Sequence, residues 1–268
     1  IKNLEIKTRT SVAAYHGYNF LLARENLTDH LPLNKKKDKI RQRLLKIRAK
    51  KVIAATGSIE RPLIFNNNDR PGIILSSAIK KYSDYYGVVC GKENILFTNN
   101  DSAYETAISL FNKGIKINAI IDIREKVNSE ITNHAEKIGI KIYNSYTIVD
   151  TSGYRRIKEV SIMKLSKDGQ SVTGSKIKIK CNCLGISGGW TPAVHLFTQS
   201  GGKLKFDNED NVFIPSKYPS DQISIGSCNG EFDLNTIIKN FNQNIKNFLG
   251  IDKTCLLYTS DAADDGLS

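Results

Sequence analysis

The sequence predicts an α/β fold of two nested domains, each a parallel sheet with a three-stranded antiparallel meander. A strand–helix–strand pattern between residues 95 and 123 predicts the parallel strands. Stretches in which polar and apolar residues alternate occur twice along the chain and predict the two meanders. With 268 residues, 40% of them hydrophobic, the chain is long enough to bury the cores of two such domains.

The strand–helix–strand unit has the clearest signals. Residues 95–97 form a short apolar run, which predicts a buried strand, and Ser102 with Glu105 has the spacing of a helix capping box. Gly114 predicts the end of that helix, and the apolar run that ends at Asp122 predicts the second strand. Because the strands are parallel, the helix should begin beside the carboxyl end of the first one.

The other elements follow from periodicity and stop signals. Asn128 or Ser129 is expected to cap a further helix that Gly139 ends. Apolar runs predict strands at residues 52–56 and 140–143, and alternation predicts meander strands at residues 11–24, 41–48, 146–150, 157–165 and 175–186. An amphipathic helix is expected at residues 234–249.

These elements indicate two nested dinucleotide-binding domains. We expect residues 1–90 to form the C-terminal part of the first domain, residues 91–186 an inserted second domain, and residues 187–253 the return to the first domain. Residues 254–268 lack the Lys, Ile and Asn that are frequent elsewhere and resemble a translated sequencing adapter, so an artefact is expected there. Because the chain begins with Ile1 and its single Met is Met163, we expect a fragment of a longer protein.

The net charge of +12 does not indicate a nucleic-acid-binding protein. Ten of the 39 basic residues lie in residues 35–51, where they alternate with apolar residues on a predicted strand. No aromatic side chain lies among them to stack on bases, so the strand is expected to be a solvated face or a contact for a protein partner. No window reaches the roughly 20 apolar residues that a membrane span needs, so no membrane association is expected.

The sequence offers no catalytic triad and no metal site. Cys90, Cys181, Cys183 and Cys228 lack the spacing of a disulfide framework, which favours reduced thiols in the cytoplasm. Cys181 and Cys183 are expected to share a strand face, but no second pair completes a metal site. Ser187 does not lie in a strand–turn–helix nucleophile motif, so hydrolase chemistry is not expected.

Two glycine-containing strand ends are candidate cofactor sites. Ala55, Thr56 and Gly57 follow an apolar strand, and such small residues allow a cofactor to approach the backbone closely. Gly226 and Ser227 lie in a turn ahead of the closing helix, and the backbone amides of this turn and the positive helix end suit a phosphate or the edge of a flavin ring. Ser227 stands where many flavoproteins carry an Asp.

The turn of the strand–helix–strand unit predicts a degenerate nucleotide site. A working turn reads G-x-G-x-x-G or A, but Thr98 and Asn100 occupy the first two glycine positions, and only Ala103 keeps the third. Asp122 keeps the acidic position that binds a ribose hydroxyl. A side chain at either glycine position fills the volume of the pyrophosphate, so we expect no bound nucleotide here.

Several long stretches carry a family resemblance. They are residues 55–78, 97–107 and 187–207, with shorter echoes at residues 8–12 and 41–52. On these residues the chain resembles the alpha subunits of heterotetrameric bacterial sarcosine oxidases. The matching stretches follow one another in the same order and together span about residues 1–250.

The resemblance implies a region similar to flavin-dependent disulfide reductases that holds NAD. It also implies FMN at the contact with a beta subunit, FAD on that partner, gamma and delta subunits, and tetrahydrofolate in a domain beyond residue 250. The whole complex would oxidise the CH–NH group of sarcosine, and this fragment alone would be inactive. A related opine or amino-acid oxidase alpha subunit, or a non-catalytic dinucleotide-binding interaction subunit, stays open. By the resemblance, the residues that line NAD are Ala55, Thr56, Gly57, Gly226 and Ser227, with Val12 near the adenine.

Overall fold

The chain consists of two compact units. The computed structural model describes residues 3–37, 39–219 and 221–250, so the segment 254–268 lies outside the described residues. A first unit comprises Ile1–Ser58 and Thr191–Ser268, and an inserted unit comprises Ile59–Trp190. The chain passes between the units within strands β5 (Ser58–Glu60) and β14 (Trp190–Pro192), which pair with each other.

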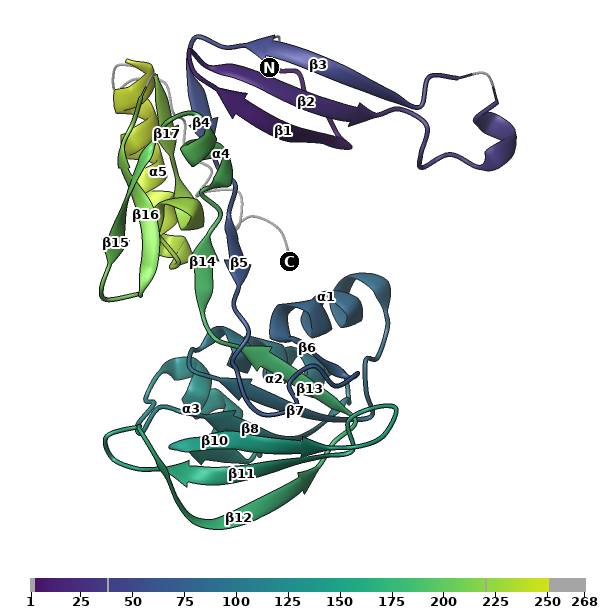
Figure 1. Cartoon of the computed structure of the whole chain (residues 1–268), viewed down its shortest axis with the longest axis vertical. Helices are drawn as coiled ribbons and strands as arrows, with labels where there is room; N and C mark the ends of the chain where they lie inside the picture. The colour runs from purple at the N-terminus through teal and green to yellow at the C-terminus, as the bar shows by residue number, and fades with distance from the viewer. Residues whose placement is uncertain (1–2, 38, 220, 251–268) are drawn as a thin grey trace, which may run out of the picture. The chain divides into compact units, whose positions relative to one another are not determined.

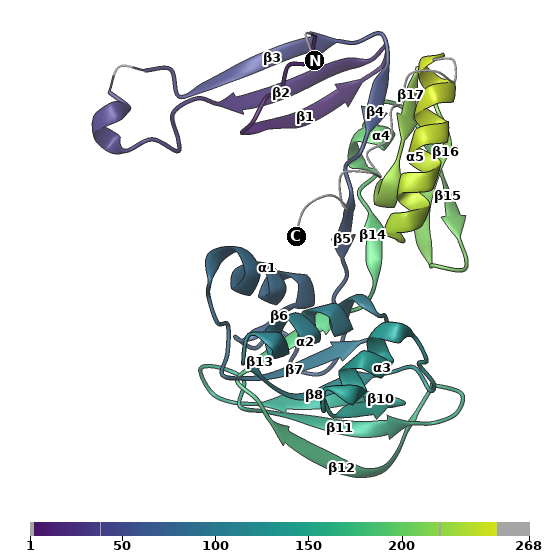
Figure 2. The ribbon, with the colours of Figure 1, turned by 180° about the vertical axis from the view of Figure 1, so that it is seen from behind.

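The inserted unit contains a five-stranded parallel sheet in the order β6-β13-β7-β8-β9 (Figure 1). Its strands are β6 (Ile73–Leu75), β7 (Glu93–Thr98), β8 (Lys116–Asp122), β9 (Ile142–Asn144) and β13 (Cys183–Ser187). One face carries helices α1 (Ser76–Tyr86), α2 (Ser102–Asn112) and α3 (Glu130–Lys137). The other face carries an antiparallel meander of β10 (Tyr146–Ser152), β11 (Glu159–Leu165) and β12 (Val172–Lys180), as Figure 2 shows from behind. The predicted α/β fold class is confirmed.

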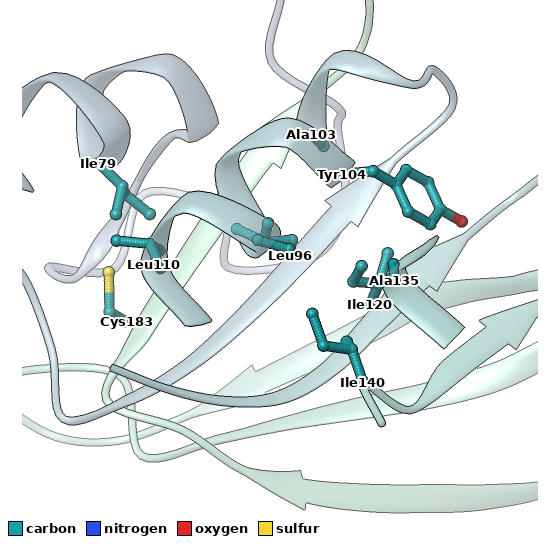
Figure 3. Packing of buried hydrophobic residues seen from close by; sticks show 10 residues of the cluster. Ile79, Leu96, Ala103, Tyr104, Leu110, Ile120, Ala135, Ile140 and Cys183 are labelled. Carbon is teal, nitrogen blue, oxygen red and sulfur yellow. The ribbon is translucent and has the colours of Figure 1, made fainter. Parts of the chain in front are cut away.

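Two hydrophobic cores lie on the two faces of this sheet. Successive side chains of a strand point to opposite faces, so Leu96 packs under the helices while Ile95 and Phe97 pack against the meander. Figure 3 shows the helix-side core, in which Leu96 of the sheet lies toward Leu110 of α2, and Ile120 lies beside Ala135 of α3. Burial on both faces explains why the strands read as continuous apolar runs.

The predicted third meander strand is two strands. Residues 175–186 were expected to form one strand, but β12 ends at Lys180 and β13 enters the parallel sheet between β6 and β7. Asn182 makes the break, because its N–H donates to the Glu93 oxygen at 2.9 Å and its side-chain oxygen accepts from the Glu93 N–H at 3.0 Å. Cys181 therefore packs on the meander side and Cys183 on the helix side, so the predicted shared face was wrong.

The inserted unit starts earlier than the second domain predicted at residue 91. β6 is the edge strand of the parallel sheet beside β13, and α1 packs against α2, so residues 59–90 join this unit. The ranges 1–90, 91–186 and 187–253 stay a prediction for the domains of the longer protein.

The first unit has a meander, a parallel strand pair and a closing helix. The meander consists of β1 (Thr10–His16), β2 (Phe20–Asn26) and β3 (Gln42–Arg48). The remaining elements are the parallel pair β4 (Val52–Ala54) and β17 (Gln222–Ser224), the hairpin β15 (Lys203–Asp207) and β16 (Val212–Lys217), and helices α4 (His195–Gln199) and α5 (Leu234–Leu249). Among the described residues, none of the helices combines the length and apolar character that a bilayer crossing requires.

Asn19 ties the meander to the parallel pair. Its side-chain nitrogen donates to the main-chain oxygens of Lys50 at 3.2 Å and Asp221 at 3.0 Å, the residues that lead into β4 and β17. Its side-chain oxygen accepts from the Tyr15 hydroxyl at 2.7 Å. Asn19 is only 4% exposed and has a φ of 52°, a conformation that Asn tolerates better than most residues. The turn of the meander is thereby fixed at the start of both strands.

Candidate functional site

The candidate site lies where β4 and β17 end. The two strands are parallel, with Val52, Ile53 and Ala54 opposite Gln222, Ile223 and Ser224. The pairing continues one step further, because the N–H of Ile225 donates to the oxygen of Ala54 at 3.0 Å. The carboxyl ends of both strands, and the loops that follow them, therefore lie side by side.

The loop after β4 is held in place by hydrogen bonds. The Thr56 hydroxyl donates to the oxygen of Ala193 at 2.7 Å, and the N–H of Ala193 donates to the oxygen of Gly57 at 2.9 Å. Gly57 has a φ of 75°, which favours glycine. Ala55 and Thr56 are both exposed, so the backbone here is accessible to a ligand.

The loop after β17 is a short 3-10 turn, Gly226–Asn229. It begins at Gly226 with a φ of 70°. The Cys228 thiol is 1% exposed and lies 3.3 Å from the oxygen of Ala54 and 3.2 Å from that of Ile225, so it anchors the turn to both strand ends. Sequence reasoning missed this positioning role, because the spacing of Cys228 from other residues carries no signal for it.

The space beside the two glycines fits a ligand that approaches the backbone. A Cβ at Gly57 would meet only the Ser227 hydroxyl oxygen, at 4.0 Å, and a Cβ at Gly226 would meet only the Ile237 side chain, at 3.7 Å. Four of the predicted residues, Ala55, Thr56, Gly57 and Gly226, thus come together with the fifth, Ser227. Within the described residues, no hydrogen bond or ion pair joins Val12, which is 40% exposed in β1, to these loops.

The positive end of α5 is occupied by the chain itself. The Asp233 carboxylate accepts hydrogen bonds from the N–H and the hydroxyl of Thr236, both at 2.8 Å. These bonds lower the pKa of Asp233, which keeps its negative charge at the helix start. The expected phosphate or flavin contact at the turn and helix end stays a prediction, and the amides beside the site belong to the 3-10 turn.

In the inserted unit, Asn100 fills the turn that would hold a pyrophosphate. Its side-chain nitrogen lies 3.0 Å from the Ser187 hydroxyl, and its side-chain oxygen accepts from the N–H of Ser102 at 3.1 Å and from the Ser102 hydroxyl at 2.6 Å. The Thr98 hydroxyl also accepts from the Asn100 N–H at 3.0 Å. The start of α2 is therefore closed by side chains of the turn. The predicted capping box was wrong, because Glu105 pairs with Lys80 instead.

Asp122 is likewise engaged within the protein. It is 0% exposed and accepts from the Tyr104 hydroxyl at 2.8 Å and from the Arg124 guanidinium at 2.7 Å. Arg124 reaches across to Asp101 at 2.8 Å. Burial, then the neighbouring Asp122, raises the pKa of Tyr104, so its hydroxyl keeps the proton that it donates. A ribose would have to displace Arg124, which supports the predicted loss of nucleotide binding at this turn.

The described residues offer no other reactive cluster. No three His, Cys, Asp or Glu side chains gather there as a metal site would require. Burial raises the pKa of both Cys181 and Cys183 to about 12, which keeps them as unreactive thiols at neutral pH. Ser187 is fully buried beside Asn100, where it supports the turn.

Comparison with curated proteins gives three alpha subunits. The chain is 34% identical over 227 residues to sarcosine oxidase subunit alpha of Corynebacterium sp. (strain P-1), covering 84% of this chain and 23% of the relative. It is 31% identical over 225 residues to that of strain U-96, and 29% identical over 219 residues to that of Rhizobium meliloti (strain 1021). The chain thus spans less than a quarter of the length of these relatives. No protein-family model matches it.

Solved structures share the fold at low sequence identity. Thioredoxin reductase of T. acidophilum has a TM-score of 0.59 at 16% identity, over 90% of this chain and 72% of its own. L-proline dehydrogenase of P. horikoshii has a TM-score of 0.55 at 19% identity, over 87% of this chain and 41% of its own. The predicted resemblance is therefore confirmed: over most of its length, on a disulfide-reductase-like fold, this chain is similar to a segment of sarcosine oxidase alpha subunits.

Proposed function

We propose that this chain is the NAD-holding segment of an alpha subunit in a sarcosine-oxidase-type complex. The observation that carries the proposal is the junction of β4 and β17, where two parallel strands end in glycines with φ of 75° and 70°. Carboxyl ends of adjacent parallel strands are where dinucleotides bind in α/β sheets. The similarity to three alpha subunits over 79–84% of the chain supports the same assignment.

In this proposal each loop has a defined task. Ala55, Thr56 and Gly57 present exposed backbone to the dinucleotide, and Gly226 with Ser227 covers it from the second strand. Ser227 offers a hydroxyl where a carboxylate would hold a ribose more strongly, so backbone contacts carry more of the binding. When bound, NAD supplies a ring that can accept a hydride. Val12 lies near the adenine in this arrangement.

The wider complex is proposed from the relatives. FMN would lie at the contact with a beta subunit, FAD on that subunit, and tetrahydrofolate in a domain beyond residue 250, with gamma and delta subunits completing a cytoplasmic oxidoreductase. The substrate class is an amine with a CH–NH group, sarcosine in particular. We assign no acid, base or nucleophile among the described residues to that chemistry, and we expect the chain to be inactive alone.

The cofactor is tested by releasing it. Purified full-length alpha subunit is denatured, and the nucleotide in the supernatant is identified by mass spectrometry. NAD is the expected result, whereas FAD or no nucleotide would overturn the assignment. An Ala55→Asp variant places a carboxylate beside the pyrophosphate and should lower the NAD content by about ten-fold or more, which corresponds to about 1.4 kcal/mol. Asn247→Asp adds the same charge on exposed α5 and should leave the NAD content unchanged.

The activity is tested on the assembled complex. Co-expressed full-length alpha, beta, gamma and delta subunits should form peroxide in the presence of sarcosine, and the chain alone should not. If the complex holds NAD but oxidises proline or an opine instead, the NAD assignment stands and the sarcosine assignment fails.

A further inference from the structure

A pocket lies within the inserted unit. It has a volume of about 370 Å³ and lies between α1 and α2. Its lining combines a buried carboxylate, two aromatic rings and lysines of α1. The lining residues are Glu60, Ser77, Lys80, Lys81, Asp84, Tyr85, Ser102, Glu105, Thr106 and Trp190. The proposed NAD site uses none of them.

Glu60 is the unusual member of this lining. It is 5% exposed, and one of its oxygens, Oε2, accepts both the Ser77 N–H at 2.9 Å and the Ser77 hydroxyl at 2.6 Å. The hydrogen bonds from Ser77 both go to Oε2, and Lys80 of the lining pairs with Glu105. Because Oε2 lies at the positive start of α1, Oε1 is the atom that a cationic or hydrogen-bonding ligand would meet.

The lysines and carboxylates at the rim are not equivalent. Lys80 pairs with Glu105 at 3.4 Å, and Asp84 is engaged by Lys113. Lys81 is exposed and forms no ion pair within the described part of the chain. The pocket thus offers a carboxylate inside, Glu60, and an ammonium group at the rim, Lys81, and neither belongs to the ion pairs of the rim.

The aromatic side chains add an apolar wall. The Trp190 indole N–H donates to the Ser102 hydroxyl at 3.1 Å, which fixes the ring in the pocket. Tyr85 lies at the rim and is 78% exposed. Aromatic faces attract both aliphatic chains and ammonium groups.

A phosphate does not suit this pocket. The start of α2, which would receive it, is closed by Asn100, which accepts from the N–H and hydroxyl of Ser102. The Glu60 carboxylate would also repel an anion placed inside.

We propose that this pocket binds a zwitterionic α-amino acid. Its ammonium group bonds Glu60 Oε1, its carboxylate meets Lys81, and its aliphatic part lies against Trp190. The ammonium group and the carboxylate of one small ligand then meet Glu60 and Lys81 together, whereas a simple amine or a simple acid meets only one of the two. The inference does not depend on the NAD site or on the identity of the oxidised substrate.

Trp190 makes the proposal directly testable, because it is the single Trp of the chain. L-leucine is titrated into the full chain while Trp190 fluorescence is recorded, with calorimetry as a second measurement. A saturable change is expected. The amine 3-methylbutylamine and the acid 4-methylpentanoate, each lacking one charge of leucine, should bind at least about ten-fold more weakly.

Two variants separate the charges from the fold. Glu60→Gln keeps an oxygen for both Ser77 hydrogen bonds but loses the charge, so leucine binding should weaken about ten-fold or more. Lys81→Gln, on the exposed side of α1, should weaken leucine and leave 3-methylbutylamine unchanged. The control Glu136→Gln, an exposed carboxylate on α3 outside the lining, should change neither.

Several results would overturn the proposal. They are no leucine binding by either measurement, equal binding of 4-methylpentanoate and leucine, or unchanged leucine affinity in Glu60→Gln. Ala55→Asp should bind leucine normally, so a failure here and a failure at the NAD site are distinguishable.

Discussion

Replacing Arg124 by Met tests the closed nucleotide turn of the inserted unit. Asp122 is 0% exposed and accepts from the Arg124 side chain through Nε at 3.0 Å and Nη2 at 2.7 Å. Arg124→Met keeps most of the aliphatic stem but removes these bonds and the ion pair. The Tyr104 hydroxyl at 2.8 Å and the main-chain N–H of residue 124 at 2.9 Å still hold the carboxylate.

The loss of stability in Arg124→Met follows from the burial of Asp122, the other member of the ion pair. Removing one member of a buried ion pair destabilises a protein by about 3–5 kcal/mol, because the other charge stays buried and uncompensated. The Arg124 side chain is 30% exposed, and two hydrogen bonds to Asp122 remain, so the lower end applies. We expect a loss of about 3 kcal/mol in the free energy of unfolding, a large share of the total of about 5–15 kcal/mol.

Urea unfolding followed by Trp190 fluorescence measures this cost, because the single Trp belongs to the inserted unit. Adding Asp122→Asn to Arg124→Met should recover part of the loss, since the buried charge is then gone. Arg155→Met, at an exposed position, is the control. A loss below about 1 kcal/mol, as an exposed pair would give, or strict additivity in the double variant would refute the reasoning.

Three further predictions concern the same unit. The stability of the folded chain should fall between pH 9 and pH 12, because burial raises the pKa of the Cys181 and Cys183 thiols from 9.0 to about 12. In this pH range the unfolded chain loses the two thiol protons before the folded chain does. The double variant Cys181→Ala/Cys183→Ala should therefore show a smaller decline in the thermal midpoint. Gly185→Ala should cost about 2 kcal/mol in urea unfolding, because its Cβ would lie 2.4 Å from a methyl carbon of Leu96. Thr98→Gly/Asn100→Gly should bind no additional equivalent of NAD by calorimetry, because Asp122, the acidic residue at the end of β8, stays paired with Arg124.

Each of these has a contrary outcome. A thermal midpoint that stays constant above pH 9 would show that ionisation of the two buried thiols does not lower the stability. Wild-type stability in Gly185→Ala would show that the core yields to an extra methyl group. One additional equivalent of bound NAD in the double-glycine variant would show that the turn alone had closed the site.

Local patterns predicted most of the elements. The helix expected at residues 234–249 is α5 (Leu234–Leu249), because its apolar positions recur at helical spacing and Gly250 follows it. Ser129 caps α3 as expected, with Thr132 as the second member of its capping box. These features depend on residues three or four positions apart, which the sequence displays directly.

Features that depend on residues far apart in the chain could not be predicted from local sequence patterns. The end of β12 depends on Asn182 bonding to Glu93, far away in the chain. The capping box expected at Ser102 does not form, because the N–H and the hydroxyl of Ser102 both donate to the side-chain oxygen of Asn100. The candidate site was predicted by its small residues, but the anchoring thiol of Cys228 depends on the pairing of two strands from opposite ends of the chain.

The nested topology also sets an order for folding during synthesis. β4 leaves the ribosome before the inserted unit, but its partner β17 follows only after that unit is complete. At bacterial to eukaryotic translation rates this interval is on the order of ten seconds, during which β4 has unpaired backbone groups. Lys50 and Lys51, exposed directly before β4, place charge next to this vulnerable edge and discourage aggregation of the nascent chain. The inserted unit should therefore fold first, and pulsed hydrogen exchange on stalled chains would show its sheet protected before β4.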